Sequence, residues 1–278
     1  NLALAYLDPG DLGLVPDPGY VPYTMGAMLA GAEVVTMPLV ATRDFLPDLD
    51  AVPAELRDRA VMMWLNYPNN PTGACADTGF LTAAVAFARE HDILICYDAP
   101  YTDVTYDGYV ASSILEIDGA RAVAIEFNSL SKTFNMAGWR MGMAVGNAEV
   151  LAALAQVKSN VDSGMFYPLQ EAAVRALEVD AAWISERNAI YRERFSVLID
   201  GLRELGLDVP MPRAALYLWA RVPEGRDAEA LARCWLNEAG VAVAPGAFFG
   251  PSGRDYVRVS VTAPVPRIQE AVDRLLAL

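Results

Sequence analysis

Three short segments of the chain are almost wholly apolar and are typical of buried β-strands: residues 61–67, 93–98 and 122–127. A segment with helical spacing of its apolar residues, 78–92, separates the first two. Strands that are apolar on both faces and alternate with helices indicate a parallel sheet covered on both sides. The sequence therefore predicts an α/β fold. Because the strands of such a sheet are buried on both faces, polar functional side chains are expected outside them.

A long helix divides the rest of the chain. Apolar residues recur at helical spacing from Trp183 to Leu205 and stop at Gly206. Strand and helix patterns then alternate up to residue 278 in a smaller α+β arrangement. We predict two domains, residues 1–182 and residues 183–278. Further upstream, Asn147 is expected to cap the helix that follows it.

Composition excludes several classes of protein. The chain has 278 residues and a net charge of −14, with no cluster of basic residues of the kind that binds nucleic acid. Its apolar runs are shorter than the roughly 18 residues that span a bilayer. Three widely spaced cysteines and a single histidine, His91, form neither a disulfide framework nor a metal-binding pattern. We expect a cytoplasmic protein without a metal site, a membrane segment or a nucleic-acid partner.

Polar clusters follow each of the three apolar strands. They occupy residues 66–73, 97–101 and 128–132. Ligands of parallel sheets bind beyond the carboxyl ends of the strands. The three clusters are therefore expected to meet at one edge of one sheet and to form a single site.

The third cluster contains Lys132, whose amine can form an imine with a carbonyl compound. Ser129, Ser131 and Arg140 surround it in the sequence and offer hydroxyl and guanidinium donors suited to a phosphate. An imine-forming lysine beside a phosphate cradle is typical of a pyridoxal phosphate site. Taken alone, the same segment also fits a solvated loop with an ordinary basic pair.

Five further residues have both a functional and a structural interpretation. Asp98 could pair with a pyridine nitrogen, and Asn70 and Tyr101 could hydrogen-bond a ring oxygen. Tyr20 could stack on a planar cofactor, and Arg258 could clamp a carboxylate. The structural alternatives are an exposed turn aspartate, residues that begin a helix, a packing aromatic ring and an outward-pointing arginine.

Five motifs together carry a family resemblance. They are NPTG at 70–73, YDAPY at 97–101, SLSKTFNMAGWRMG at 129–142, PGAFFG at 245–250 and RVS at 258–260. In this order and spacing, the chain resembles a fold-type I pyridoxal-phosphate enzyme of the class I/II aminotransferase family over essentially its whole length. The resemblance implies a mainly parallel, seven-stranded type of sheet between helices, with a smaller C-terminal α+β domain.

The resemblance also implies how the residues hold the ring of pyridoxal 5'-phosphate. Lys132 forms the imine with the cofactor and later acts as the general base, and Asp98 pairs with the pyridine nitrogen. Asn70 and Tyr101 contact the ring oxygen, and Tyr20 stacks on the ring.

For the other groups, the resemblance implies that Ser129, Ser131 and Arg140 contact the phosphate. Arg258, together with Asn70, binds the α-carboxylate of the substrate. The reaction implied moves an amino group between an L-amino acid and a 2-oxo acid, with 2-oxoglutarate as the expected acceptor.

Within the family, residues 127–147 and 157–166 are most similar to bacterial LL-diaminopimelate aminotransferases, which act in lysine biosynthesis. Alanine or aspartate aminotransferases remain alternatives. A pyridoxal-phosphate lyase on the same fold, or a non-catalytic regulatory module, also remains open, because a fold does not fix a reaction.

Family members carry an N-terminal arm and a glycine-serine phosphate-binding turn before the segment that matches residues 1–11. Either both lie upstream of Asn1, or the chain is a truncated paralogue that lacks them. In either case we expect the chain as it stands to bind the cofactor weakly, and we expect the homodimer typical of the family from the full-length protein.

Overall fold

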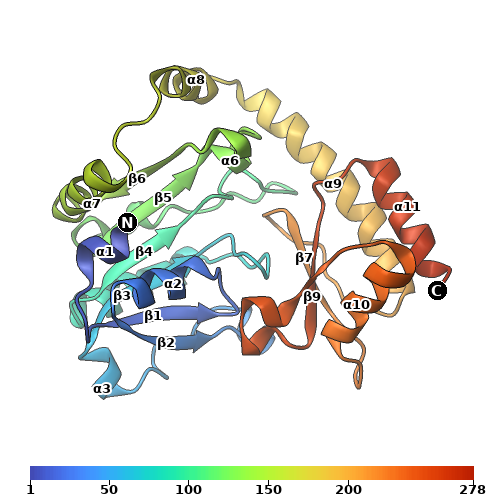
Figure 1. Ribbon diagram of the computed structural model, residues 1–278, viewed down its shortest axis with the longest axis horizontal. Coiled ribbons are helices and arrows are strands. Elements are labelled where there is room, and N and C mark those ends of the chain that lie inside the picture. Colours follow the sequence, from blue (N-terminus) through green and yellow to red (C-terminus); the bar gives the residue numbers. More distant parts are fainter.

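The computed structural model describes residues 1–278 and contains two sheets (Figure 1). The larger sheet has six strands in the order β2-β1-β3-β4-β5-β6, of which only β6 is antiparallel to its neighbour. The strands are β1 (Leu12–Asp17), β2 (Glu33–Pro38), β3 (Ala60–Asn66), β4 (Leu94–Asp98), β5 (Ala124–Ser129) and β6 (Gly142–Gly146). The sheet is mainly parallel, as predicted, and has six strands rather than seven in this chain.

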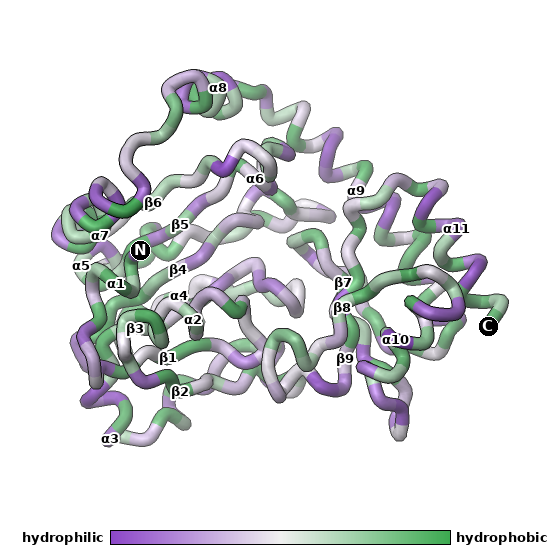
Figure 2. Tube along the Cα trace, viewed as in Figure 1, coloured by the Kyte–Doolittle hydropathy of each residue, from purple (hydrophilic) through white to green (hydrophobic).

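Helices cover both faces of this sheet, so neighbouring residues of one strand enter two different cores. Met62 of β3 packs in a cluster with residues of α1 and α2, whereas Met63 packs on the opposite face with residues of α4. Both side chains are almost completely buried. This double burial explains why β3 and β4 are hydrophobic over most of their length, up to their polar last residues (Figure 2). The helices of this unit are α1 (Leu2–Tyr6), α2 (Pro22–Leu29), α3 (Ala54–Arg57), α4 (Thr78–Glu90), α5 (Ala120–Val123), α6 (Leu130–Thr133), α7 (Ala148–Val161) and α8 (Tyr167–Leu177).

The second sheet belongs to a C-terminal unit that begins with the predicted long helix. Its three antiparallel strands lie in the order β7-β9-β8 and pack against α9, α10 and α11. The elements are α9 (Ala181–Glu204), β7 (Tyr217–Arg221), α10 (Ala228–Ala239), β8 (Ala244–Pro245), β9 (Tyr256–Ser260) and α11 (Val265–Leu276). The predicted long helix begins two residues earlier than expected, where the Asp180 side chain accepts a hydrogen bond from the Ala182 N–H. We propose the domain boundary between residues 182 and 183, within the first turn of this helix.

A segment from the first unit completes the core of the C-terminal unit. After β4, Val104 and Tyr106 are buried in the same apolar cluster as Phe195 of α9. Backbone hydrogen bonds of 2.9 Å run from the Tyr106 N–H to the Arg213 carbonyl and from the Ala215 N–H to the Val104 carbonyl. The two units therefore share a core instead of meeting only across a surface.

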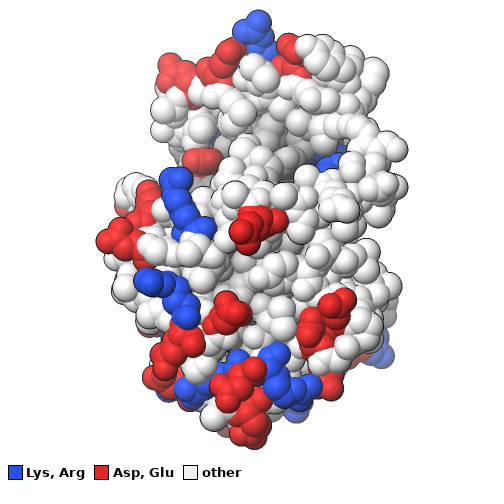
Figure 3. Space-filling view, turned by 90° about the vertical axis from the view of Figure 1, so that its left-hand side faces the viewer, with Lys and Arg blue, Asp and Glu red and all other residues white.

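No helix of the chain combines the length and the apolar character needed to cross a bilayer. On the face shown in Figure 3, acidic and basic side chains are interspersed and no continuous basic patch is visible.

Helices α9 and α11 approach closely at Gly201. A Cβ atom added to Gly201 would lie 2.4 Å and 2.7 Å from the two methyl carbons of Val272. Val272 is itself buried, and its β-branched side chain has little rotamer freedom in a helix. The glycine therefore sets the distance between the two helices.

We expect Gly201→Ala to destabilise the protein, although alanine normally favours a helix over glycine by about 1 kcal/mol. Overpacking against Val272 costs about 1–3 kcal/mol, so the free energy of unfolding should fall. In a double-mutant cycle with Val272→Ala, the double variant should be more stable than the sum of the single effects by at least about 1 kcal/mol. Urea unfolding measures all four proteins. A stabilised Gly201→Ala variant would contradict this packing.

Candidate active site

All nine side chains singled out in the sequence line one cavity of about 320 Å³ between the two units. They are Tyr20, Asn70, Asp98, Tyr101, Ser129, Ser131, Lys132, Arg140 and Arg258. The cavity lies at the carboxyl edge of the larger sheet, where the strands end toward the C-terminal unit (Figure 1). The topology thus brings together residues that are up to 238 positions apart in the chain.

Asp98 reaches the cavity because it is the last residue of β4. In the parallel register it lies between Asn66 of β3 and Phe127 of β5. The Asn66 amide donates to the Asp98 carbonyl at 2.7 Å, and its Oδ1 accepts from the Asn70 N–H at 2.7 Å. Asn66 therefore fixes the loop that carries Asn70 against the end of β4.

The Asp98 carboxylate faces the cavity from a poorly solvated position. Burial raises its pKa to about 6, and a 2.5 Å hydrogen bond from the Tyr23 hydroxyl acts in the opposite direction. Tyr23 is buried and stacks on Trp64 with ring centroids 4.5 Å apart. Burial, followed by the charge of Asp98, raises the pKa of Tyr23, so its hydroxyl stays protonated as a donor. The arrangement suits a carboxylate that pairs with a cationic group of a ligand.

Lys132 lies on the short helix α6, directly after the end of β5. Ser129, the last residue of β5, caps this helix, and its hydroxyl oxygen accepts from the Ser131 N–H at 3.2 Å. The Lys132 amine lies 6.0 Å from the centre of the Tyr101 ring. Arg140 enters the cavity from a left-handed backbone conformation, with φ of 56°. Two hydroxyls and a guanidinium beside an amine can bind an anionic group next to a nucleophile.

Arg258 enters from the opposite side, on the central strand of the small sheet. Its Nη1 donates to the Asn70 Oδ1 at 2.8 Å. The guanidinium lies 4.3 Å from the centre of the Tyr217 ring and 4.6 Å from that of Phe249, and its buried Nε–H has no partner. A stacked guanidinium with donors to spare is suited to binding a carboxylate.

Tyr23, Asn66 and Tyr217 also line the cavity, and the sequence did not single them out. The Tyr217 hydroxyl lies 2.9 Å from the Tyr101 hydroxyl, across the boundary between the units. Asn66 could have been found, because it ends an apolar strand next to the Asn70 cluster. The sequence around Tyr23 and Tyr217 does not indicate a role in the site, because the partner of each hydroxyl lies far away in the sequence.

Asp17 is another residue that the sequence did not reveal. It is buried at the end of β1 and accepts hydrogen bonds from the Ser252 hydroxyl at 2.9 Å and the Ser252 N–H at 3.2 Å. Gly250 approaches so closely, with φ of 134°, that an added Cβ would lie 2.0 Å from the Asp17 Oδ1. The Gly19 N–H also donates to the Phe249 carbonyl at 2.8 Å. These contacts fasten the turn that carries Tyr20 to the C-terminal unit.

The fold and the site define a class of enzyme. The profile described as "Aminotransferase class I and II" matches residues 1–275. The chain belongs to the aminotransferase class I and II family, and it is an aminotransferase that acts on amino acids and 2-oxo acids.

The chain is also similar to individual proteins named LL-diaminopimelate aminotransferase. The chain is 48% identical over 278 residues to the LL-diaminopimelate aminotransferase of Syntrophobacter fumaroxidans, covering 100% of this chain and 72% of that protein. It is 47% identical over 275 residues to the LL-diaminopimelate aminotransferase of Moorella thermoacetica, covering 99% of this chain and 70% of that one.

Solved structures share the fold. Substrate-bound BacF from Bacillus subtilis superimposes with a TM-score of 0.95 at 39% identity, covering 99% of this chain and 70% of that one. An aspartate aminotransferase variant from Thermus thermophilus gives a TM-score of 0.91 at 32% identity, with 99% and 76% covered.

We expect Asp98→Asn to stabilise the cofactor-free protein at neutral pH. Because burial raises the pKa of Asp98 from 3.8 to about 6, the folded wild type loses stability as the pH rises between these values. Above that range the variant should unfold with a free energy about 3 kcal/mol higher, and the gap should close toward about pH 4. Urea unfolding between about pH 4 and about pH 8 measures this difference. A gap that does not change with pH would contradict the assignment.

Proposed function

We propose that the chain is a pyridoxal 5'-phosphate-dependent aminotransferase that acts on LL-diaminopimelate, with 2-oxoglutarate as the acceptor. The observation that carries the proposal is the placement of the Lys132 amine and the Asp98 carboxylate in one cavity of about 320 Å³, beside Ser129, Ser131 and Arg140. The choice of amino acid rests on the two LL-diaminopimelate aminotransferases to which the chain is similar.

The residues present fit pyridoxal phosphate. Asp98 is a partly buried carboxylate suited to a protonated pyridine nitrogen, and Tyr23 orients it. Ser129, Ser131 and Arg140 supply the donors that a phosphate needs. When bound, the cofactor supplies an electron sink for the negative charge that develops on the α-carbon of the substrate.

The residues of the chain divide the chemistry between them. Lys132 would hold the cofactor until the amine of the substrate takes its place there, and the freed Nζ would then take the proton from the α-carbon of the substrate as general base. Asp98 keeps the pyridine nitrogen protonated, because an ionised carboxylate stabilises a neighbouring cation in a poorly solvated site. Tyr20 stacks on the ring, and Asn70 and Tyr101 donate to the ring oxygen.

Arg258 and Asn70 hold the α-carboxylate of the substrate. The Arg258 guanidinium is already oriented by Asn70 and by stacking between Tyr217 and Phe249, so little side-chain entropy is lost on binding. This placement leaves the amino group of the substrate free to face Lys132.

We also propose that the active form is a cytoplasmic homodimer. Exposed apolar side chains on and next to α2 support this, since Val21, Met25, Met28 and Leu29 are each about half exposed or more. Contiguous apolar surface of this kind is typical of protein–protein contacts. The three cysteines are unpaired, as in a reducing compartment.

Lys132 and Lys158 are the only two lysines, which makes a direct test possible. With pyridoxal phosphate, borohydride should label Lys132, while Lys158, exposed on α7 and paired with Asp162, should stay unlabelled by peptide mass spectrometry. Lys132→Ala should reduce glutamate formation from LL-diaminopimelate and 2-oxoglutarate on the order of 10⁴-fold, because the general base is lost. Lys158→Ala is the matched control and should retain wild-type activity.

Two outcomes of this test would count against the proposal. Label on Lys158, or normal activity of Lys132→Ala, would remove Lys132 from the reaction. Release of ammonia together with an oxo acid, without formation of glutamate, would identify a lyase instead of a transaminase.

Arg258→Lys should raise the KM for the amino acid about tenfold to a hundredfold, because an ammonium group cannot form the bidentate contact with a carboxylate. We expect a smaller change in kcat. Steady-state kinetics measure both constants, and Arg267→Lys, an exposed substitution on α11, is the control. An unchanged KM would show that another group binds the α-carboxylate.

A further inference from the structure

A buried arginine on α9 contacts the backbone of the residues that carry the active-site lysine. Arg187 is only 5% exposed and forms no hydrogen bond to a carboxylate. Burial lowers its pKa, and the nearby Tyr191, Tyr106 and Asp103 act in the opposite direction. Arginine is rarely buried without a paired anion, so a specific set of acceptors must hold it in place.

The acceptors are three main-chain carbonyls and the side-chain oxygen of Asn188, which accepts from Nε at 3.2 Å and from Nη2 at 2.7 Å. Arg187 Nη1 donates to the Lys132 carbonyl at 3.1 Å and also to the Thr133 carbonyl, and its Nη2 donates to the Asp103 carbonyl at 2.6 Å. Lys132 and Thr133 end helix α6, where carbonyls have no partner within the helix. One guanidinium therefore satisfies the end of the helix that carries Lys132.

The third acceptor connects a second part of the site. Asp103 lies two residues after Tyr101, and its carboxylate accepts a hydrogen bond from the Thr133 hydroxyl at 3.1 Å. Asn188 donates to the same Asp103 carbonyl at 2.9 Å. The segment that carries Tyr101 and the helix that carries Lys132 are therefore held against the same turn of α9.

Tyr191, one turn further along α9, adds a contact to the turn that follows Lys132. Its hydroxyl donates to the Asn135 Oδ1 at 3.0 Å, and Asn135 has a positive φ of 54°. Contacts from α9 thus hold the chain from Lys132 to Asn135.

We propose that Arg187 is a positioning residue for Lys132: its planar guanidinium holds the carbonyls of residues 132 and 133 so that the lysine amine stays directed into the cavity. This inference rests on the proposed function of Lys132. Lysine at position 187 could satisfy only some of the three carbonyls, because an ammonium group lacks the fixed fork geometry.

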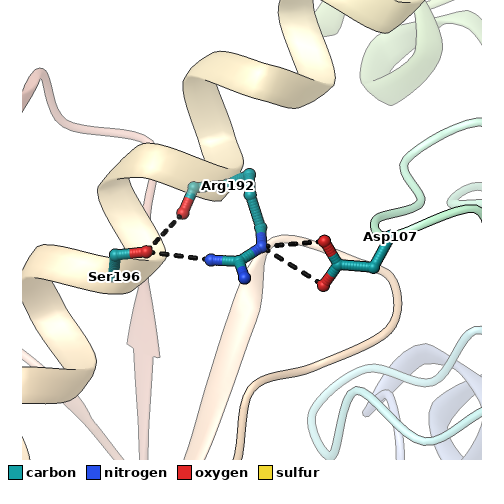
Figure 4. A network of polar contacts seen from close by, with 3 residues as sticks. All are labelled: Asp107, Arg192 and Ser196. Carbon is teal, nitrogen blue, oxygen red and sulfur yellow. Dashed lines mark hydrogen bonds and ion pairs between the residues drawn. The ribbon is translucent and has the colours of Figure 1, made fainter.

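Arg192 provides a matched control on the same helix. It contacts Asp107, at 3.1 Å and 3.2 Å, and the Ser196 hydroxyl at 2.9 Å (Figure 4). Both partners in the ion pair are more than a third exposed. Arg192→Gln removes the same charge from α9 without touching the residues around Lys132.

The experiment compares wild type, Arg187→Gln, Arg187→Lys and Arg192→Gln, each loaded with pyridoxal phosphate. Three quantities are measured: cofactor retained after desalting, the fraction trapped on Lys132 by borohydride, and KM with kcat. For Arg187→Gln we expect retained cofactor and KM within about twofold of wild type, and trapping and kcat lower by about tenfold or more, because small misplacements of a reacting group are costly. Arg187→Lys should be intermediate, and Arg192→Gln should match wild type.

The remaining outcomes overturn the inference. One is a fraction of cofactor trapped on Lys132 in Arg187→Gln that equals the wild-type fraction. Another is a fall in both the retained cofactor and the trapped fraction, which would show a purely structural role for Arg187. If thermal unfolding shows that Arg187→Gln does not fold, the test uses Arg187→Lys instead. A trapped fraction and a kcat equal to those of wild type in Arg187→Lys would then overturn the proposal. Absence of label on Lys132 in the wild type itself would instead overturn the proposed function, and this inference with it.

Discussion

The active site depends on a constraint of parallel sheets that are covered on both faces. Helices pack on each side of β3, β4 and β5, so polar side chains are costly along the strands and are accommodated where the strands end. Asn66, Asp98 and Ser129 are the last residues of these three neighbouring strands. The sheet therefore sets both the order and the spacing of the groups that face the cavity, and the C-terminal unit adds Arg258 from the other side.

Much of this arrangement could be predicted from local sequence. An apolar strand followed by a polar cluster placed Asp98 and Lys132 at one edge, and the predicted cap at Asn147 is confirmed by hydrogen bonds from the N–H groups of the next residues. Tyr23 and Asp17 were missed, because their partners lie 75 and 235 positions away in the sequence. Helix α8 was also missed: it lies in a stretch that the sequence analysis assigned to no element.

Several features that are unfavourable for stability lie around Lys132 and the cavity. Asn135 and Arg140, which flank the turn after α6, are non-glycine residues with positive φ. Arg187 is a buried cation, Asp98 is a poorly solvated carboxylate, and the Arg258 Nε–H lacks a partner. Each departs from the local rules that favour folding, and such departures are expected where function selects the conformation.

The shared core has a consequence for the order in which the chain folds during synthesis. Tyr106 must bond to the Ala215 carbonyl, 109 residues further along, before the apolar cluster of the C-terminal unit is complete. The ribosome synthesises the first half of the chain long before residue 215, so the apolar side chains of the segment after β4 stay exposed until then. Contacts between residues so far apart in the sequence slow folding, and during this time chaperones can bind the nascent chain.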